Sequence, residues 1–329
     1  MAKISKAKLL EAVLDSIRAS GWNAIILNSA HPFRISMYRG ESRVIFHCYI
    51  WNLTHGGYPR DPNELRIQFT GVEHFTIESG SKTLVLGFND ELRMFAGFDV
   101  TKHGRFGSSP STQIRRETLE HAKATDFYPQ IRHNDEIAIG FRPEFFATYV
   151  NELEALHGSA QHLEDVEAVM QIADANAANI QDIPDGPRRT VVEQIQRRVR
   201  NGRFCKNVLT AYGHRCAASD IQLDLLDAAH IIPVEHERGT DETKNGLCLS
   251  ALHHRAFDHK LIGVTRKYRI IFHEENFTKL RAIGWEGGEK TFRDGCRDAI
   301  NLPARREFYP DPDYLVFGQV LRGWSARHL

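Results

Sequence analysis

The first half of the chain shows one stretch of helical periodicity followed by a series of short apolar segments. Between residues 6 and 20, large apolar side chains recur at helical spacing, and Gly21 provides a stop. These side chains are Leu9, Leu10, Val13, Leu14 and Ile17. The segments that follow have the length and composition of strands. They are 24–27, 33–38, 43–51, 64–69, 83–88, 94–100 and 136–141.

A closing helix is predicted at 144–156, directly after Pro143. Strands in succession with flanking helices predict an α+β domain built around a mainly antiparallel sheet over residues 1–155. Residues 156–189 are predicted to be a linker, because they include the turn-rich break from Asp182 to Pro187. Residues 190–329 then form a second domain, and a chain of 329 residues is long enough for two separate cores.

The second domain contains a short strand, a polar loop and a helix in succession. The apolar run Ala228–Ile232 ends at Pro233 and predicts the strand. The polar segment Gly239–Gly246 contains two glycines and predicts the loop. Residues 251–262 predict a helix, and 263–272 a further strand. Strand, loop and helix together make a ββα unit.

Four side chains of this unit have the chemistry of a phosphodiester-cleaving site. His230 lies on a stiff strand, where an imidazole can take a proton from water near neutral pH. His254 and Asp258 lie four residues apart on one helix face, at the spacing that two ligands of one metal ion need. Asn245 can hydrogen-bond backbone groups and fix the loop. Each feature alone is more typical of a core histidine or a surface pair, but their order and spacing together favour a one-metal site.

These residues resemble the motif of the HNH nuclease family, which has a ββα-metal fold. The segments that carry the resemblance are Leu226–Pro233, Asn245–Leu249 and His253–Asp258. The segment before them, Arg203–Ala217, also resembles the one that precedes the motif in restriction-type HNH domains. The resemblance implies a metal-dependent DNA endonuclease. In such an enzyme His230 is the general base, Asn245 braces the loop, His254 binds the metal, and Asp258 is the helix partner of His254.

One position departs from the family pattern. Many members carry a metal-ligating His or Asp directly before the base histidine, where this chain has Ala229. Because side chains alternate along a strand, Asp227 shares the face of Ala229 and is either a ligand from one pleat further along or an ordinary carboxylate. A set of Asp227, His254 and Asp258 favours one Mg²⁺ or Mn²⁺ ion per site. The five cysteines form no Cys-x-x-Cys pair, so no structural zinc is expected.

Basic side chains are concentrated just before the ββα unit. Between residues 188 and 206, seven Lys and Arg residues stand against the single acid Glu193. The chain as a whole has a formal net charge of +0, so DNA affinity must come from local clusters. We expect this cluster to contact the phosphate backbone, although such a run is often only a solvated helix face. The residues predicted to do so are Arg197, Arg198, Arg203 and Lys206.

Composition is that of an ordinary globular protein, with 42% hydrophobic and 26% charged residues. No run approaches the roughly 18 apolar residues of a membrane span. The first residues lack the apolar core of a signal peptide, so a cytoplasmic protein without a membrane partner is expected.

Two functions fit these observations best. The first is a restriction or defence endonuclease acting on double-stranded DNA, in which residues 1–155 select the target. Modified cytosine is a candidate target by analogy of domain arrangement, and double-strand cleavage favours a homodimer. The glycine-rich basic loops 54–60 and 102–111 suit phosphate contact or base stacking, or are plain hairpin loops. The alternative is a ligand- or partner-gated nonspecific nuclease with an N-terminal sensor, and a DNA-binding protein with an inactive nuclease fold is least favoured.

Overall fold

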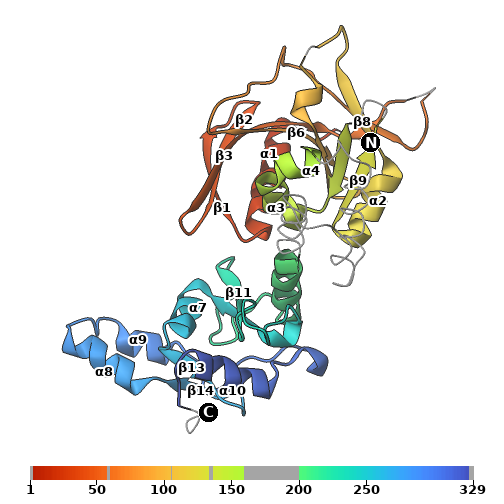
Figure 1. Cartoon of the computed structure of the whole chain (residues 1–329). Helices are drawn as coiled ribbons and strands as arrows, with labels where there is room; N and C mark the ends of the chain where they lie inside the picture. The colour runs from red at the N-terminus through yellow and green to blue at the C-terminus, as the bar shows by residue number, and fades with distance from the viewer. Residues whose placement is uncertain (1–2, 58–59, 105, 133–135, 159–199, 326–329) are drawn as a thin grey trace. The chain divides into compact units, whose positions relative to one another are not determined.

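The computed structural model describes residues 3–57, 60–104, 106–132, 136–158 and 200–325 (Figure 1). The chain divides into two compact units, Met1–Val199 and Arg200–Leu329. No helix within the described ranges is both long and apolar enough to cross a membrane.

A seven-stranded sheet forms the centre of the first unit. Its strands lie in the order β1-β2-β3-β6-β7-β10-β9, and every neighbouring pair is antiparallel except β3 and β6. A separate three-stranded sheet has the order β4-β5-β8. The strands are Asn23–Asn28 (β1), Phe33–Arg39 (β2), Ser42–Asn52 (β3), Thr54–His55 (β4), Glu64–Gln68 (β5), Lys82–Asn89 (β6), Met94–Phe98 (β7), Ser111–Arg115 (β8), Phe127–Ile131 (β9) and Ile137–Phe141 (β10).

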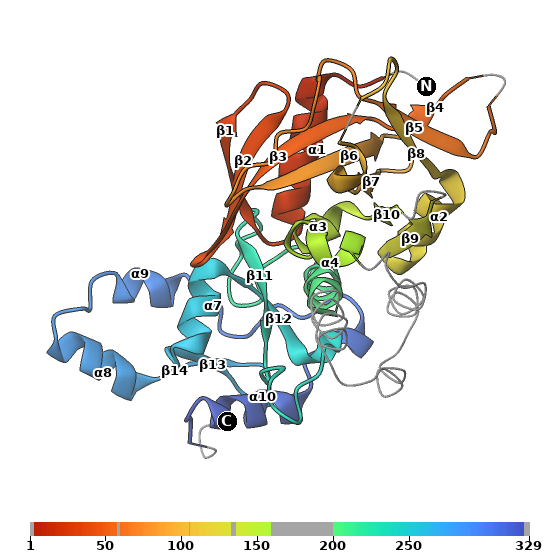
Figure 2. The same cartoon turned by 45° about the horizontal axis from the view of Figure 1, so that its top comes forward.

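The central strands are buried on both faces, which explains their nearly continuous apolar sequences. On β3, Phe46 and Ile50 point into one core, whereas Tyr49 and Trp51 point into the other. Helices α1 (Lys6–Ala19) and α3 (Phe146–Asn151) contribute to the first core. The small sheet and α2 (Arg116–Thr125) contribute to the second. Figure 2 shows α1 alongside β3 and α2 beside β8 and β9.

The α+β class with a mainly antiparallel sheet, predicted from the sequence, is confirmed. The helix predicted at 144–156 is wrong as a single element. The segment forms the 3₁₀ turn η2 (Pro143–Phe145), then α3, then α4 (Leu153–Gly158), and Glu152 between the last two leaves helical geometry (φ −97°, ψ 16°). Likewise, the strand predicted at 94–100 ends at Phe98, and Asp99 caps the 3₁₀ turn η1 (Val100–Lys102).

The second unit is built on two small hairpins and several short helices around one apolar core. Residues 200–211 are helical and pack Phe204 and Val208 into this core. The remaining elements are β11 (Leu226–His230), η5 (Thr243–Asn245), β12 (Gly246–Ser250), α7 (Ala251–Asp258), β13 (Ile262–Val264), β14 (Ile270–Phe272), α8 (Glu274–Ala282), α9 (Glu289–Asp294), η6 (Arg306–Phe308) and α10 (Pro312–Leu321).

Three predicted elements of this unit need correction. The strand predicted at 228–232 runs instead from Leu226 to His230. The helix predicted at 251–262 ends at Asp258, because Lys260 adopts a positive φ of 59° and Ile262 already begins β13. The strand predicted at 263–272 is a hairpin of β13 and β14. Its turn is closed by hydrogen bonds between Thr265 and Arg269 and by the positive φ of Tyr268 (62°).

Candidate active site

Strands β11 and β12 and helix α7 bring the predicted site residues into one neighbourhood. The strands pair antiparallel, with His230 opposite Gly246 and Asp227 opposite Leu249. Helix α7 follows β12 directly, and the Ser250 hydroxyl caps it by accepting from the backbone N–H of His253 (3.4 Å). Side chains of the strand and of the first helical turns can therefore meet.

His230 is held in a fixed orientation by two side chains. The ring of Phe204 stacks on the imidazole with centroids 3.7 Å apart and planes at 10°. On the ring edge, Nε2 lies 3.1 Å from Oδ1 of Asp241, a residue of the polar loop. Only 18% of the His230 side chain is exposed. A carboxylate at Nε2 favours the tautomer with the proton on that nitrogen, which leaves Nδ1 as the basic atom.

Asn245 fixes the loop that carries Asp241. Its side chain is fully buried. The amide Nδ2 donates to the carbonyl oxygens of Ile232 (3.0 Å) and Thr240 (2.8 Å), and Oδ1 accepts from the N–H of Ile232 (2.9 Å). One amide thus joins Ile232, two residues after β11, to Thr240, the residue before Asp241.

The three predicted metal ligands form a contiguous polar cluster. Nδ1 of His254 lies 3.2 Å from Oδ2 of Asp227, and Nε2 of the same ring lies 3.5 Å from Oδ2 of Asp258. The pairing of His254 and Asp258 is the one that their four-residue spacing predicts. Asp227 also reaches this histidine, from the face of β11 that it shares with Ala229.

The donor types of the cluster suit a divalent cation, but its donor atoms do not point to one common position. Two carboxylates and an imidazole are donors that Mg²⁺ and Mn²⁺ accept. However, the carboxylates lie at opposite nitrogens of one ring, and no set of three His, Cys, Asp or Glu side chains in the described ranges is arranged to hold a metal ion. Both carboxylates are about half exposed, at 48% and 52%, so side-chain rotation can redirect them.

Arg322, which the sequence did not indicate, connects the two halves of the site. This residue follows α10, and its guanidinium donates to the backbone carbonyls of His230 (2.9 Å) and Ile231. It also lies 3.4 Å from Asp258 and 4.4 Å above the ring of Phe257. Burial lowers the pKa of Arg322. The arginine, with 13% of its side chain exposed, therefore places a positive charge between the base histidine and the ligand cluster.

The predicted DNA-contacting residues are only partly within the described residues. Arg197 and Arg198 lie outside them. Arg203 and Lys206 lie on the helix at 200–211, are half-buried, and each takes part in an interaction within the protein. This helix also supplies Phe204, which stacks on His230.

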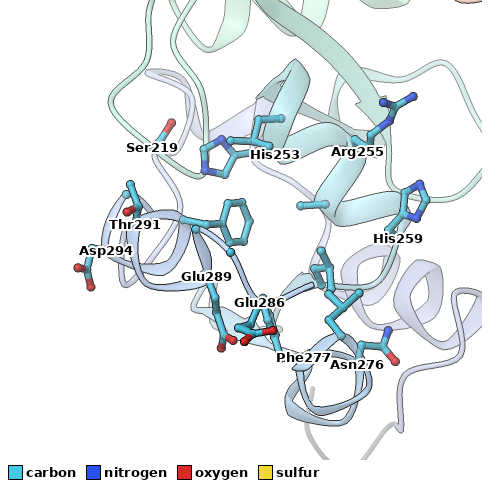
Figure 3. A pocket seen from close by; sticks show the side chains of 18 of the residues that line it. Ser219, His253, Arg255, His259, Asn276, Phe277, Glu286, Glu289, Thr291 and Asp294 are labelled. Atoms are coloured by element: carbon cyan, nitrogen blue, oxygen red, sulfur yellow. The ribbon is translucent and has the colours of Figure 1, made fainter. Parts of the chain in front are cut away.

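A cavity of about 1590 Å³ lies against α7, on sides of the helix that do not carry His254 and Asp258. Figure 3 shows its wall, with His253 from α7 above Phe277 of α8 and with Glu286 and Glu289 at its lower edge. None of the predicted catalytic or metal-binding residues lines it. His253 is buried and bonded to the Ser250 hydroxyl (2.7 Å), so it supports the start of α7 and does not join the ligand cluster.

Comparison with known proteins identifies the class of this site. A family model described as "HNH endonuclease" matches residues 216–265, which span β11, the loop, β12 and α7. A second model, described as "Methylase-associated X1", matches residues 44–150. No curated protein matches the chain. One similar solved structure is a "Modification dependent TagI restriction endonuclease", with 15% identity, coverage of 83% of this chain and 80% of that chain, and a TM-score of 0.30.

The ββα unit is therefore an HNH endonuclease domain, and the protein is a nuclease. Nucleases of this family generally use a divalent metal ion, and their substrate is DNA. The resemblance found in the sequence is confirmed at this level. The roles of individual residues remain predictions.

Proposed function

We propose that the protein is a restriction-type endonuclease that hydrolyses phosphodiester bonds in double-stranded DNA. The observation that carries the proposal is the position of His230, which lies inside the segment that matches the HNH endonuclease model and is held between Phe204 and Asp241. The methylase-associated model over residues 44–150 supports the restriction type, because restriction depends on the methylation state of DNA. In this proposal residues 1–155 select the target DNA, residues 156–189 link the two domains, and residues 190–329 cut the DNA.

His230 is the general base of the proposed reaction. Asp241 holds Nε2, so Nδ1 accepts a proton from water as the water oxygen attacks phosphorus. The bond from phosphorus to the leaving sugar oxygen breaks, and that oxygen takes up a proton from solvent water. Asn245 acts as a positioning residue, because it fixes the loop that presents Asp241.

Asp227, His254 and Asp258 would hold the metal ion, with Mg²⁺ or Mn²⁺ as the matching choice. When bound, the ion would stabilise the charge that develops on the phosphate and the leaving oxygen. Arg203 and Lys206, with Arg197 and Arg198, would contact the phosphate backbone and supply affinity that depends on salt but not on sequence.

The test is cleavage of a panel of plasmids that carry unmodified, cytosine-methylated or cytosine-hydroxymethylated DNA, each incubated with protein and Mg²⁺ or Mn²⁺. We expect discrete fragments from at least one plasmid and none with EDTA. His230→Ala should lower the rate by at least about a thousandfold, as loss of a reacting side chain does in other hydrolases. His259→Ala is the matched control, because this exposed histidine follows the same helix α7 outside the cluster.

Other outcomes decide against the proposal. A His230→Ala protein that cuts at the wild-type rate contradicts the assignment of the base. Degradation of every plasmid to small pieces, triggered by an added ligand or partner, would favour a gated nonspecific nuclease instead. No cutting of any plasmid would favour an inactive nuclease fold.

A further inference from the structure

The first unit contains a separate cavity, of about 690 Å³, between the edges of its two sheets. Its walls are β8, the first part of α2, and β9, and all its lining residues fall within residues 61–132, inside the segment that matches the methylase-associated model. β8 is an edge strand of the small sheet and β9 an edge strand of the large one. Figures 1 and 2 show α2 beside both strands. Sheet edges expose backbone donors and acceptors, so this opening is polar as well as concave.

Gln130 joins the two edges and leaves a hydrogen-bonding group in the cavity. Its Oε1 accepts from the backbone N–H of Arg115 (2.7 Å) and from Oγ1 of Thr118 (3.0 Å). These donors fix the orientation of the amide, and its NH₂ group has no partner among the described residues. Glu117 has one oxygen bonded to Nδ2 of Asn63 (2.6 Å), which leaves its second oxygen as an acceptor.

Two rings and one aliphatic side chain line part of the cavity. Tyr128 of β9 is half-buried, and His121 of α2 packs against it with ring centroids 4.7 Å apart and planes at 40°. Ile131, at the end of β9, is 43% exposed. Aromatic faces of this kind stack on nucleobases.

The charges of the lining favour a base inside the cavity and a phosphate outside it. The lining contains three acids, Asp61, Glu64 and Glu117, and two arginines, Arg115 and Arg132. Glu64 is paired with Arg60 (3.0 Å). Arg132 is further bonded to Thr112 and Glu136. Arg115 is exposed and has no ion-pair partner in the part of the chain that the structure describes, so it is the cation available to a phosphate at the rim.

We propose that this cavity takes one nucleotide turned out of the DNA duplex, with its base on Tyr128 and its edge read by Gln113, Gln130 and Glu117. The proposal rests on the proposed function and gives residues 1–155 their means of selection. A base outside the stack exposes its edge and any group attached to it, so a modified base can be told from an ordinary one. A volume of about 690 Å³ lies within the range of about 300–1,000 Å³ typical of small-ligand sites.

The test uses a mismatch, because a mispaired base costs less to extrude than a paired one. The full-length His230→Ala protein is titrated in EDTA with two 24-base-pair duplexes that differ only in a matched or mismatched central pair. We expect about tenfold tighter binding of the mismatched duplex, since stacking contributes about 1–3 kcal/mol per base. Tyr128→Ala in the same background should reduce the preference for the mismatched duplex below about twofold. Gln113→Ala, which changes an exposed side chain, should reduce this preference by less.

Tyr38→Ala is the matched control, since Tyr38 is a half-buried tyrosine on β2 that does not line the cavity. It should keep the preference. Equal affinity for matched DNA in all variants shows that the variants are folded. If the background protein shows no preference, or if Tyr128→Ala and Gln113→Ala both keep it, the inference is wrong although wild-type cleavage still supports the proposed function. If the wild type cuts no plasmid and binds neither duplex, the proposed function itself fails.

Discussion

His230 is more tightly constrained than a surface histidine on a strand. Phe204 limits rotation of the ring plane, Asp241 holds Nε2, and Arg322 holds the backbone carbonyl of the histidine itself. Each contact acts on a different part of the residue: face, edge and main chain. Together they aim Nδ1 in one direction, which is what a general base needs before substrate arrives.

Asp241→Asn tests this constraint at the scale of one atom pair. An amide can present either its oxygen or its NH₂ group to Nε2, so the histidine tautomer is no longer fixed. We expect kcat for plasmid cleavage to fall by about ten- to a hundredfold, the usual effect of removing a partner of a functional histidine, with KM for DNA unchanged.

The comparison variant is Asp224→Asn, which removes the same charge from an exposed position before β11. A wild-type kcat and pH profile for Asp241→Asn would show that the contact only stabilises the loop.

Asp227→Ala tests whether the strand carboxylate replaces the ligand that is missing at Ala229. Asp227 contacts His254 on the nitrogen opposite to Asp258. If it binds the ion, its loss should raise the Mg²⁺ concentration for half-maximal cleavage by about tenfold or more. The measurement is cleavage rate against Mg²⁺ concentration, with Asp224→Ala as the control; a superimposable curve for Asp227→Ala would remove Asp227 from the ligand set.

Sequence spacing was informative for residues that are close along the chain and uninformative for the others. His254 and Asp258 meet because four positions make about one helical turn, which is a local property. Asp241 reaches His230 only because Asn245 folds the loop back, and Arg322 lies 92 positions after His230. No periodic pattern encodes contacts of that kind.

At the scale of elements, strands with large apolar buried side chains could be predicted from the sequence. Strands with weak alternation or with a proline could not. β8 buries Thr112 at one of its two inward positions, so its alternation is weak. β9 contains Pro129, which a search for strands counts as a break and which is tolerated here because β9 lies at the sheet edge. The cavity between these two strands was therefore beyond prediction.

Asn245→Ala tests the link between β11 and the polar loop. The substitution removes three hydrogen bonds and leaves the backbone N–H of Ile232 unpaired in a buried position. We expect the free energy of unfolding to fall by about 1–3 kcal/mol, the cost of an unsatisfied buried group, and cleavage to slow because Asp241 is released. Urea denaturation and plasmid cleavage measure the two effects.

Asn207→Ala, an exposed asparagine on the helix at 200–211, is the control and should leave both quantities unchanged. Normal cleavage by a destabilised Asn245→Ala protein would mean that the loop keeps its conformation without the brace.

At the scale of the whole molecule, each copy of the chain presents one HNH segment, whereas a DNA duplex has two strands of opposite direction. Two sites related by a two-fold axis would match that symmetry, so we predict that cleavage of both strands requires two copies of the chain acting together. Mixing wild type with an equal amount of His230→Ala protein is a direct measurement. Pairs that contain one active site should nick one strand, so open-circular plasmid should accumulate. Linear product should fall to about one quarter, which is the fraction of fully active pairs that random pairing gives. If linear product falls only by half and no nicked circles accumulate, each copy cuts both strands independently.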